Sequence, residues 1–258
     1  MTRISPDPIR QFHDEGYMIV PDFFDRQQLA VLRNECDAGI DEMHQRMDAA
    51  GTDLIHISHR GARYFINHQT DRSPALKQLA FSEQMAQLCR ATLGDEVFFF
   101  LDQFVVKCAE TGMSFSWHQD AGYIKHMKVK PYLTCWIPLD DVIVENGTVF
   151  VLPYSRAGSR EAIKHIKDEN TNDMVGYHGD DPGIPVEAKA GTLVAFSSHL
   201  FHRSTPNTTA NRRRVYLLQY TQEAIYRPDG RPQNKVTPFL RQGERREVNP
   251  NALPRATY

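Results

Sequence analysis

The sequence predicts a mainly β protein whose core is a double-stranded β-helix, a cupin-like jelly roll, with flanking helices. β-Branched and aromatic residues crowd into five short runs beyond residue 96, and turn residues such as those at 145–147 and 190–192 separate the runs. The first third instead repeats its apolar residues with a helical period. This combination is typical of an antiparallel sandwich or jelly roll with helices on one outer face. The expected strands are 97–107, 132–139, 148–152, 193–196 and 214–220.

The helical part begins close to the N-terminus. We expect a short amphipathic helix after Pro6 that ends at Gly16, followed by an extended run at 17–20. Asp25 can accept a hydrogen bond from the first turn of a longer helix over 26–48. That helix carries one apolar stripe, formed by Leu29, Leu32, Cys36 and Ile40.

Two more short helices complete the first third. Ser73 and Pro74 open the first of them, Ser82 opens the second, and Gly94 ends it. The polar segment 156–187 has no clear period, and long loops in compact domains are commonly functional. We expect one domain over 1–258, with a mainly helical part (1–95), a jelly-roll core (96–225), a loop or lid beside the site (156–187) and a C-terminal extension (226–258).

Charge and composition narrow the partners. A formal charge of −2 and a pI near 6.6 supply no basic field for nucleic acid. No apolar run approaches the roughly 20 residues of a membrane span, and residues 1–6 lack the apolar core of a signal peptide. We therefore expect a cytoplasmic protein without nucleic acid or membrane partners. The four cysteines are dispersed, which favours free thiols over disulfides or a zinc–thiolate site.

The run Trp117-His118-Gln119-Asp120 carries the main chemical signal. His118 and Asp120 are two residues apart, so on a β-strand their side chains would point to the same side. His202 could complete a three-ligand face from a distant strand. Two imidazoles and one carboxylate leave the other positions of an octahedral ion open, which is the arrangement of non-haem Fe(II) oxygenases.

An arginine follows the second histidine at a suitable distance. If the chain turns through 205–211 and returns antiparallel, Arg213 comes back near the metal. Its planar guanidinium can bind a carboxylate through two hydrogen bonds, as an anchor for 2-oxoglutarate would. Arg212 and Arg214 alternate with Arg213 along the expected strand and should face the other way.

Several segments together resemble the phytanoyl-CoA dioxygenase family of Fe(II)/2-oxoglutarate oxygenases. The resemblance covers most of the chain and is carried by 12–17 with 21–24, the metal motif 117–120, the central strand pair 136–153 and the distal segment 202–213. It favours His202 over the neighbouring His199, because His202 has the family's spacing of eleven residues to Arg213. One departure is visible at 153–156, where Pro-Tyr-Ser-Arg replaces the Pro-Gly-Ser-His common in the family.

The resemblance also implies roles for single residues. Iron would be bound by His118, Asp120 and His202, while Arg213 would hold the far carboxylate of 2-oxoglutarate with a hydrogen bond from Ser204. The residues expected to line or pack against the co-substrate pocket are Gln103, Lys107 and Phe115. Lys107 has an alternative interpretation as a strand-edge lysine.

The expected reaction follows from the same resemblance. Because related halogenases replace the carboxylate ligand by a small residue, Asp120 favours hydroxylation of an unactivated C–H bond, with 2-oxoglutarate and O₂ converted to succinate and CO₂. We expect a small-molecule substrate, a metabolite or natural-product intermediate, with Tyr123 as a candidate contact. The alternative is a non-oxidative jelly-roll metalloprotein, either a binding module or an isomerase-like enzyme, that uses the same three ligands. An arginine clamp would have no evident purpose there.

Overall fold

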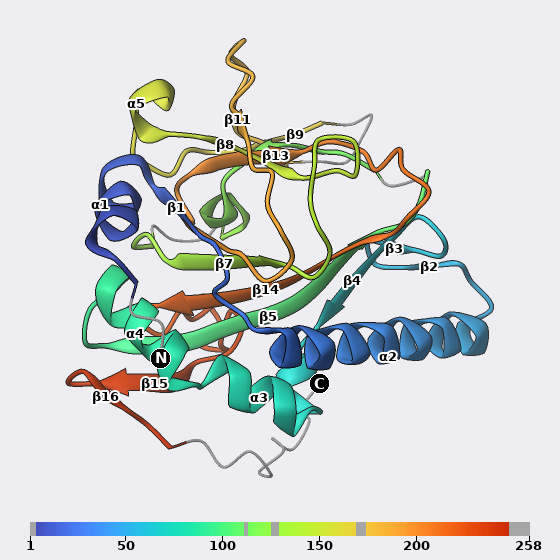
Figure 1. Cartoon of the computed structure of the whole chain (residues 1–258), viewed down its shortest axis with the longest axis horizontal. Helices are drawn as coiled ribbons and strands as arrows, with labels where there is room; N and C mark the ends of the chain where they lie inside the picture. Colours follow the sequence, from blue (N-terminus) through green and yellow to red (C-terminus); the bar gives the residue numbers. More distant parts are fainter. Residues whose placement is uncertain (1–3, 111–112, 125–128, 169–173, 248–258) are drawn as a thin grey trace.

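The computed structural model describes residues 4–110, 113–124, 129–168 and 174–247. Two antiparallel sheets face one another as layers, and helices cover the outer face of the larger sheet (Figure 1). The predicted sandwich with helices on one side is confirmed. None of the helices within these ranges is both long and apolar enough to cross a bilayer.

Within the described residues, the larger sheet contains ten strands. Its order is β1 (Tyr17–Val20), β12 (Leu193–Ser197), β7 (Leu133–Pro138), β14 (Arg213–Thr221), β5 (Val97–Lys107), β4 (Arg63–Asn67), β3 (Ser58–His59) and β2 (Leu54–Ile55). β15 (Thr237–Arg241) also pairs with the start of β5 and with β16 (Glu244–Arg245). The long strands β5 and β14 pair with each other at the centre of the sheet, and they also pair with β4 and β7 on either side.

The smaller sheet has the order β11 (Ile184–Pro185), β8 (Val149–Leu152), β13 (Phe201–Ser204) and β6 (Phe115–His118). A separate pair is formed by β9 (Ile166–Lys167) and β10 (Met174–Val175). β6 and β13 were not among the predicted strands, because each has only four residues and the polar side chains of the site interrupt its apolar pattern.

The helices begin and end largely where the cap residues predict. α1 covers Pro6–Glu15 and ends at Gly16, whose φ of 84° lies in the left-handed region. α2 covers Arg26–Ala50 behind a capping box made by Asp25 and Gln28. The remaining helices are α3 (Pro74–Ala80), α4 (Glu83–Thr92), α5 (Tyr154–Ala157) and the 3₁₀ turns η1 (Gln69–Asp71) and η2 (Asp120–Tyr123).

Alternation along β14 divides the molecule into a core and a cavity. Tyr216, Leu218 and Tyr220 face the helices and are fully buried among apolar residues. Leu217 and Gln219 face the other way, into the space between the sheets. The same strand therefore supplies the hydrophobic core on one side and the wall of a cavity on the other.

A bulge modifies this alternation in β5. Gln219 pairs with Leu101 and Tyr220 pairs with Phe99, so Phe100 is an extra residue opposite β14. Phe100 and Leu101 consequently both line the cavity, although they are neighbours in sequence.

Three regions differ from the predicted pattern. The hairpin of β2, β3 and β4 lies inside the first third that was expected to be mainly helical. The segment 156–187 is not without structure, since it contains short strands, and its role as a lid stays a prediction. In the C-terminal part, β15 joins the larger sheet.

The four cysteines are free thiols, as predicted, and burial raises the pKa of Cys36 to about 12.

The division of β14 can be tested by stability. We expect Leu218→Ala to lower the free energy of unfolding by about 2–5 kcal/mol, because it removes a fully buried side chain from a packed core. The control Leu54→Ala, at a side chain that is 48% exposed, should change it by no more than about 0.5 kcal/mol. Urea unfolding measures both, and equal effects of the two substitutions would contradict the assignment of the core face.

Candidate active site

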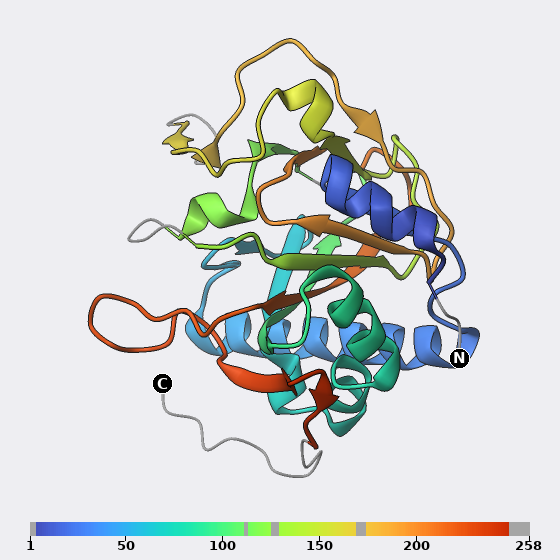
Figure 2. The ribbon, with the colours of Figure 1, turned by 90° about the vertical axis from the view of Figure 1, so that its left-hand side faces the viewer.

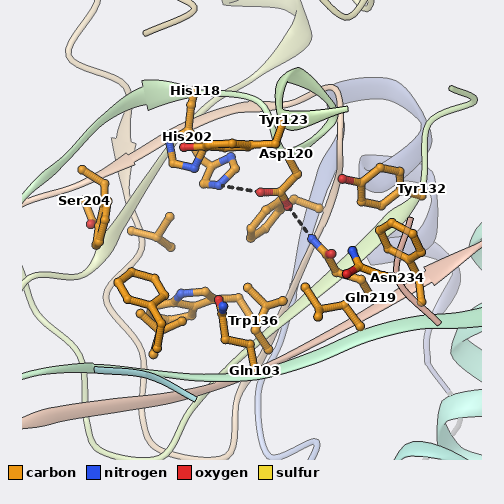
Figure 3. Close-up of a pocket in the computed structure, with 18 of the residues that line it drawn as sticks. Gln103, His118, Asp120, Tyr123, Tyr132, Trp136, His202, Ser204, Gln219 and Asn234 are labelled. Carbon is orange, nitrogen blue, oxygen red and sulfur yellow. Dashed lines mark hydrogen bonds and ion pairs between the residues drawn. The ribbon is translucent and has the colours of Figure 1, made fainter. Parts of the chain in front are cut away.

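A cavity of about 310 Å³ lies between the two sheets (Figure 3). Its walls come from β5, β7 and β14 of the larger sheet, from β6 and β13 of the smaller sheet, and from η2. It contains the residues that the sequence marked for metal and carboxylate binding, namely His118, Asp120, His202, Ser204 and Arg213.

Three side chains in the cavity form a metal-binding geometry. His118, Asp120 and His202 each direct one ligand atom to within 4.8 Å of the other two. Nε2 of His202 lies 3.6 Å from Oδ1 of Asp120, and the centroids of the imidazole rings of His118 and His202 are 4.2 Å apart. The histidines meet because β6 and β13 pair in a register that places them opposite one another. The arrangement can hold a divalent ion on one face.

Asp120 reaches this cluster differently from our expectation. The prediction placed His118 and Asp120 on one side of a single strand, and this is wrong, because β6 ends at His118. Gln119 is extended and Asp120 begins the 3₁₀ turn η2. The turn brings the carboxylate back over the end of the strand, so the spacing of two residues works through a strand end and a turn.

Hydrogen bonds behind the histidines fix their tautomers. Nδ1 of His118 lies 2.8 Å from the carbonyl oxygen of Ser116, and Nδ1 of His202 lies 3.1 Å from that of Leu200. A carbonyl oxygen only accepts, so each Nδ1 carries the proton and each Nε2 keeps its lone pair. Such second partners orient metal-ligating histidines.

The carboxylate of Asp120 is oriented in the same way. The hydroxyl of Thr134 donates to Oδ2 at 2.5 Å, and Nε2 of Gln219 donates to Oδ2 at 3.0 Å. Both donors act on one oxygen atom and leave Oδ1 on the side of His202 (Figure 3). We infer that Asp120 is held to present a single oxygen atom to an ion.

Arg213 enters the cavity as a buried charge that is only partly paired. Only 2% of the residue is exposed, and Nη2 donates to the carbonyl oxygen of Gly147 at 2.8 Å. Nε and Nη1 are buried without a hydrogen-bond partner in the described part of the chain. Burial lowers the pKa of Arg213 to about 10, so the guanidinium stays protonated at neutral pH. A buried cation with two unpaired donors is costly unless an anion binds beside it.

The surroundings hold Arg213 in this position. Its guanidinium carbon lies 5.7 Å from the centroid of the Trp136 ring, which forms one wall. Gly147 has a φ of 83°, and a Cβ there would lie 2.7 Å from the carbonyl oxygen of Thr205. The turn that accepts the Arg213 hydrogen bond therefore needs glycine at this point.

The polar residues expected beside Arg213 divide between the cavity and its wall. Ser204 lines the cavity. Lys107 is fully buried and does not itself line the cavity. Its Nζ donates to the hydroxyl of Ser204 at 2.7 Å and to the carbonyl oxygen of Thr205. Phe115 lines the cavity, and the centroid of its ring lies 5.3 Å from the Lys107 Nζ. Lys107 thus positions Ser204 and is not a strand-edge lysine.

Two further candidates lie at the wall. Gln103 lines the cavity, and its Nε2 donates to Oδ1 of Asn67 at 2.5 Å. Tyr123, in η2, is 49% exposed at the rim, with its ring centroid 5.7 Å from that of His118. Both positions are compatible with contact to a bound molecule.

The competing residues lie away from the cavity. His199 is buried and its Nδ1 is 3.1 Å from the carbonyl oxygen of Arg160. Arg212 pairs with Asp37, and Arg214 pairs with Asp37 and Asp140 on the opposite face of β14. The predicted alternation of the three arginines is confirmed.

Sequence reasoning missed the neutral residues of the site. Thr134, Gln219, Tyr132 and Asn234 belong to no short motif, although alternation along a predicted strand could have placed Gln219 on the face of Arg213. Asn234 had no such signal, because it lies in the C-terminal extension outside the predicted core.

Comparison with known proteins agrees with this geometry. The family model of phytanoyl-CoA dioxygenase matches residues 12–215, a range that contains the three candidate ligands and Arg213. The chain belongs to the phytanoyl-CoA dioxygenase family. It is accordingly an enzyme of the iron- and 2-oxoglutarate-dependent oxygenases.

Individual relatives are distant but cover most of the chain. The mouse phytanoyl-CoA dioxygenase domain-containing protein 1 is 20% identical, over 87% of this chain and 92% of its own. The ectoine dioxygenase of Stutzerimonas stutzeri is 25% identical, over 87% and 80%. The solved structure of SnoK, a non-heme alpha ketoglutarate dependent carbocyclase from nogalamycin biosynthesis, superposes with a TM-score of 0.70 at 19% identity, over 90% and 93%. The shared fold confirms the jelly-roll core.

The support of Asp120 generates a prediction about metal affinity. Thr134→Val keeps the shape of a fully buried side chain but removes the donor to Oδ2, and we expect the affinity for Fe(II) to fall about 10- to 100-fold. The control Thr92→Val removes a comparable hydroxyl, which donates to the carbonyl oxygen of Leu88 in α4, and should leave the affinity unchanged. Anaerobic metal titration distinguishes the two, and unaltered binding by Thr134→Val would refute the positioning role.

Proposed function

We propose that the protein is an Fe(II)- and 2-oxoglutarate-dependent dioxygenase that hydroxylates an unactivated C–H bond of a small molecule. The observation that carries the proposal is the buried guanidinium of Arg213 in the same cavity as His118, Asp120 and His202. Two of its nitrogen atoms have no hydrogen-bond partner among the described residues. A metal-binding set alone would suit many proteins. A metal-binding set with a buried carboxylate anchor suits a co-substrate that has a chelating end and a carboxylate end.

The residues present fit the two groups. His118, Asp120 and His202 would hold Fe(II), and Arg213 with Ser204 would bind the far carboxylate of 2-oxoglutarate. When bound, iron and 2-oxoglutarate supply the activation of O₂ and the oxidising power for C–H hydroxylation, with succinate and CO₂ as co-products.

The contribution of the protein is positioning. Arg213 and Ser204 bind and orient the co-substrate, while Thr134 and Gln219 fix the carboxylate of Asp120. The cavity walls are mostly apolar, which excludes water from the reacting centre. Arg213 is also what argues against the non-oxidative metalloprotein, where a buried unpaired arginine serves no step.

Arg213 should contribute to ligand binding at the expense of stability. We expect Arg213→Met to weaken 2-oxoglutarate binding to the metal-loaded protein by about 2–5 kcal/mol, at least about 30-fold, because it removes a buried charge partner. It should not lower the free energy of unfolding, because it also removes an uncompensated buried charge. Calorimetry and urea unfolding measure the two quantities.

The control is the neighbouring Arg212→Met, at an exposed arginine paired with Asp37. It should leave 2-oxoglutarate affinity unchanged. Full affinity in Arg213→Met would count against the proposed co-substrate.

The metal set leads to a second prediction. Asp120→Ala removes the only carboxylate of the candidate set, so we expect bound iron after dialysis and succinate formation both to fall to background. Asp229→Ala, at a surface aspartate paired with Arg231, should retain both. Iron content and 2-oxoglutarate turnover provide the measurements, and an active Asp120→Ala protein would remove Asp120 from the ligand set.

A further inference from the structure

The cavity has two ends of different chemistry. Arg213 and Gln219 lie six residues apart on β14, a span of about 20 Å along a strand. The Arg213 end is cationic and lies on the side of Ser204, because Arg213 pairs with Lys107, whose Nζ donates to Ser204. In Figure 3, Gln219 lies beside Tyr132 and Asn234, on the opposite side of the view from Ser204. If 2-oxoglutarate occupies the cationic end, the Gln219 end is left for the substrate.

The Gln219 end has an apolar wall. Phe100 packs with Tyr132 at a centroid distance of 5.4 Å, and both belong to a small buried cluster that also contains Ala121, Ile124, Val129 and Ile225. The bulge in β5 is what turns Phe100 into the cavity beside Leu101. This wall favours an apolar molecular body.

Polar groups without a partner interrupt that wall. Tyr132 is 3% exposed, and its hydroxyl makes no hydrogen bond to any part of the chain that the structure describes. The side-chain amide of Asn234 also lines the cavity and has no hydrogen-bond partner within the same ranges. The Nε2 of Gln219 donates hydrogen bonds to Asp120 and Thr134, and its amide oxygen can accept one from a bound molecule. These three groups line the cavity and can form hydrogen bonds with a polar group of a bound molecule.

A buried ion pair holds Asn234 at the cavity. The next residue, Lys235, donates from Nζ to Asp71 at 2.8 Å and to the fully buried Asp102 at 3.1 Å. Its backbone N–H donates to the carbonyl oxygen of Phe100 at 2.9 Å. The connection between β14 and β15, the orange-red loop in Figure 2, is thereby bonded to β5.

The same ion pair removes charge from this end. The ammonium of Lys235 is neutralised by two carboxylates, and Asp102 is also bonded by the backbone N–H and hydroxyl of Thr70. Apart from Asp120 of the metal set, the charged side chains that line the cavity in the described part of the chain are Arg213 and Arg203. Arg203 lies against Trp117 and Phe150 and donates to the carbonyl oxygen of Pro182. Among the residues that the structure describes, neither a carboxylate nor an ammonium group would find a charged partner beside Asn234.

We propose that the substrate is an uncharged small molecule with an apolar body and a hydroxyl, carbonyl or amide group, and that Tyr132 and Asn234 select it. The inference rests on the proposed function, which assigns the Arg213 end to 2-oxoglutarate. It names Tyr132 and Asn234 as the residues that determine specificity.

The test uses three probes with one ring skeleton, namely cyclohexanecarboxamide, cyclohexanecarboxylate and cyclohexylmethylammonium. Each is titrated by ligand-detected NMR into anaerobic protein loaded with Fe(II) and saturating 2-oxoglutarate. Saturation keeps Arg213 occupied, so the carboxylate probe reports on the other end. We expect the amide to bind at least about tenfold more tightly than either ion, because neither ion can recover its lost hydration there.

Two variants connect the preference to the named residues. Asn234→Asp should reverse it in favour of the ammonium probe, because a carboxylate replaces the amide. Tyr132→Phe keeps the ring and should weaken the amide probe about 2- to 10-fold, the effect of one hydrogen bond. Gln27→Glu makes the same amide-to-acid change at an exposed site on α2 and should leave all three affinities unchanged.

The contradicting results are distinct. Equal binding of the three probes, preference of the unaltered protein for an ion, or absence of amide binding while 2-oxoglutarate is bound would overturn the inference alone. Failure of the metal-loaded protein to bind 2-oxoglutarate would overturn the proposed function and this inference with it.

Discussion

The buried charge of Arg213 is the constraint on which the rest of the site depends. Burial withdraws the guanidinium from water, and the described residues offer it one carbonyl oxygen and an aromatic face but no carboxylate within hydrogen-bond distance. The unpaired buried charge lowers the stability of the folded protein, and the packed core on the other face of β14 offsets this loss. The cost is explained if an anionic co-substrate completes the pairing. Arg214, on the opposite face of β14, shows the contrast, because its guanidinium forms ion pairs with Asp37 and Asp140.

The two faces of the larger sheet allow rigidity and chemistry to coexist. The helix-facing residues of β5, β7 and β14 form one continuous apolar core. Because the cavity-facing residues alternate with them on the same strands, the packed core also fixes the positions of the cavity-facing residues. The smaller sheet contributes the histidines through one register, and η2 adds the carboxylate. Groups from distant parts of the sequence are therefore brought together by strand pairing and by one 3₁₀ turn. The C-terminal part takes part in the same way, because Lys235 fastens Asn234 to β5.

Much of this arrangement was predictable from the sequence, for identifiable reasons. Segments such as 97–107 and 214–220 are long and rich in β-branched and aromatic residues, so their length and their composition both predict a strand. The candidate ligands and Arg213 were recognised because the spacing of the two histidines, the carboxylate and the arginine resembles that of a known family. By contrast, β6 and β13 are short and polar at the site, and η2 could not be read from two residues of spacing. The roles of Thr134, Gln219, Tyr132 and Asn234 arise only when strands and a loop meet in space, which the local sequence does not encode.

The measurement that tests the central claim most directly is anaerobic addition of Fe(II) and 2-oxoglutarate to the metal-free protein, followed by visible absorption. The account predicts a metal-to-ligand charge-transfer band that requires both additions, because a 2-oxo acid chelated to iron would sit between the His118, Asp120 and His202 cluster and Arg213. Folded, iron-loaded protein that shows no such band with saturating 2-oxoglutarate would contradict the account and favour a non-oxidative metalloprotein.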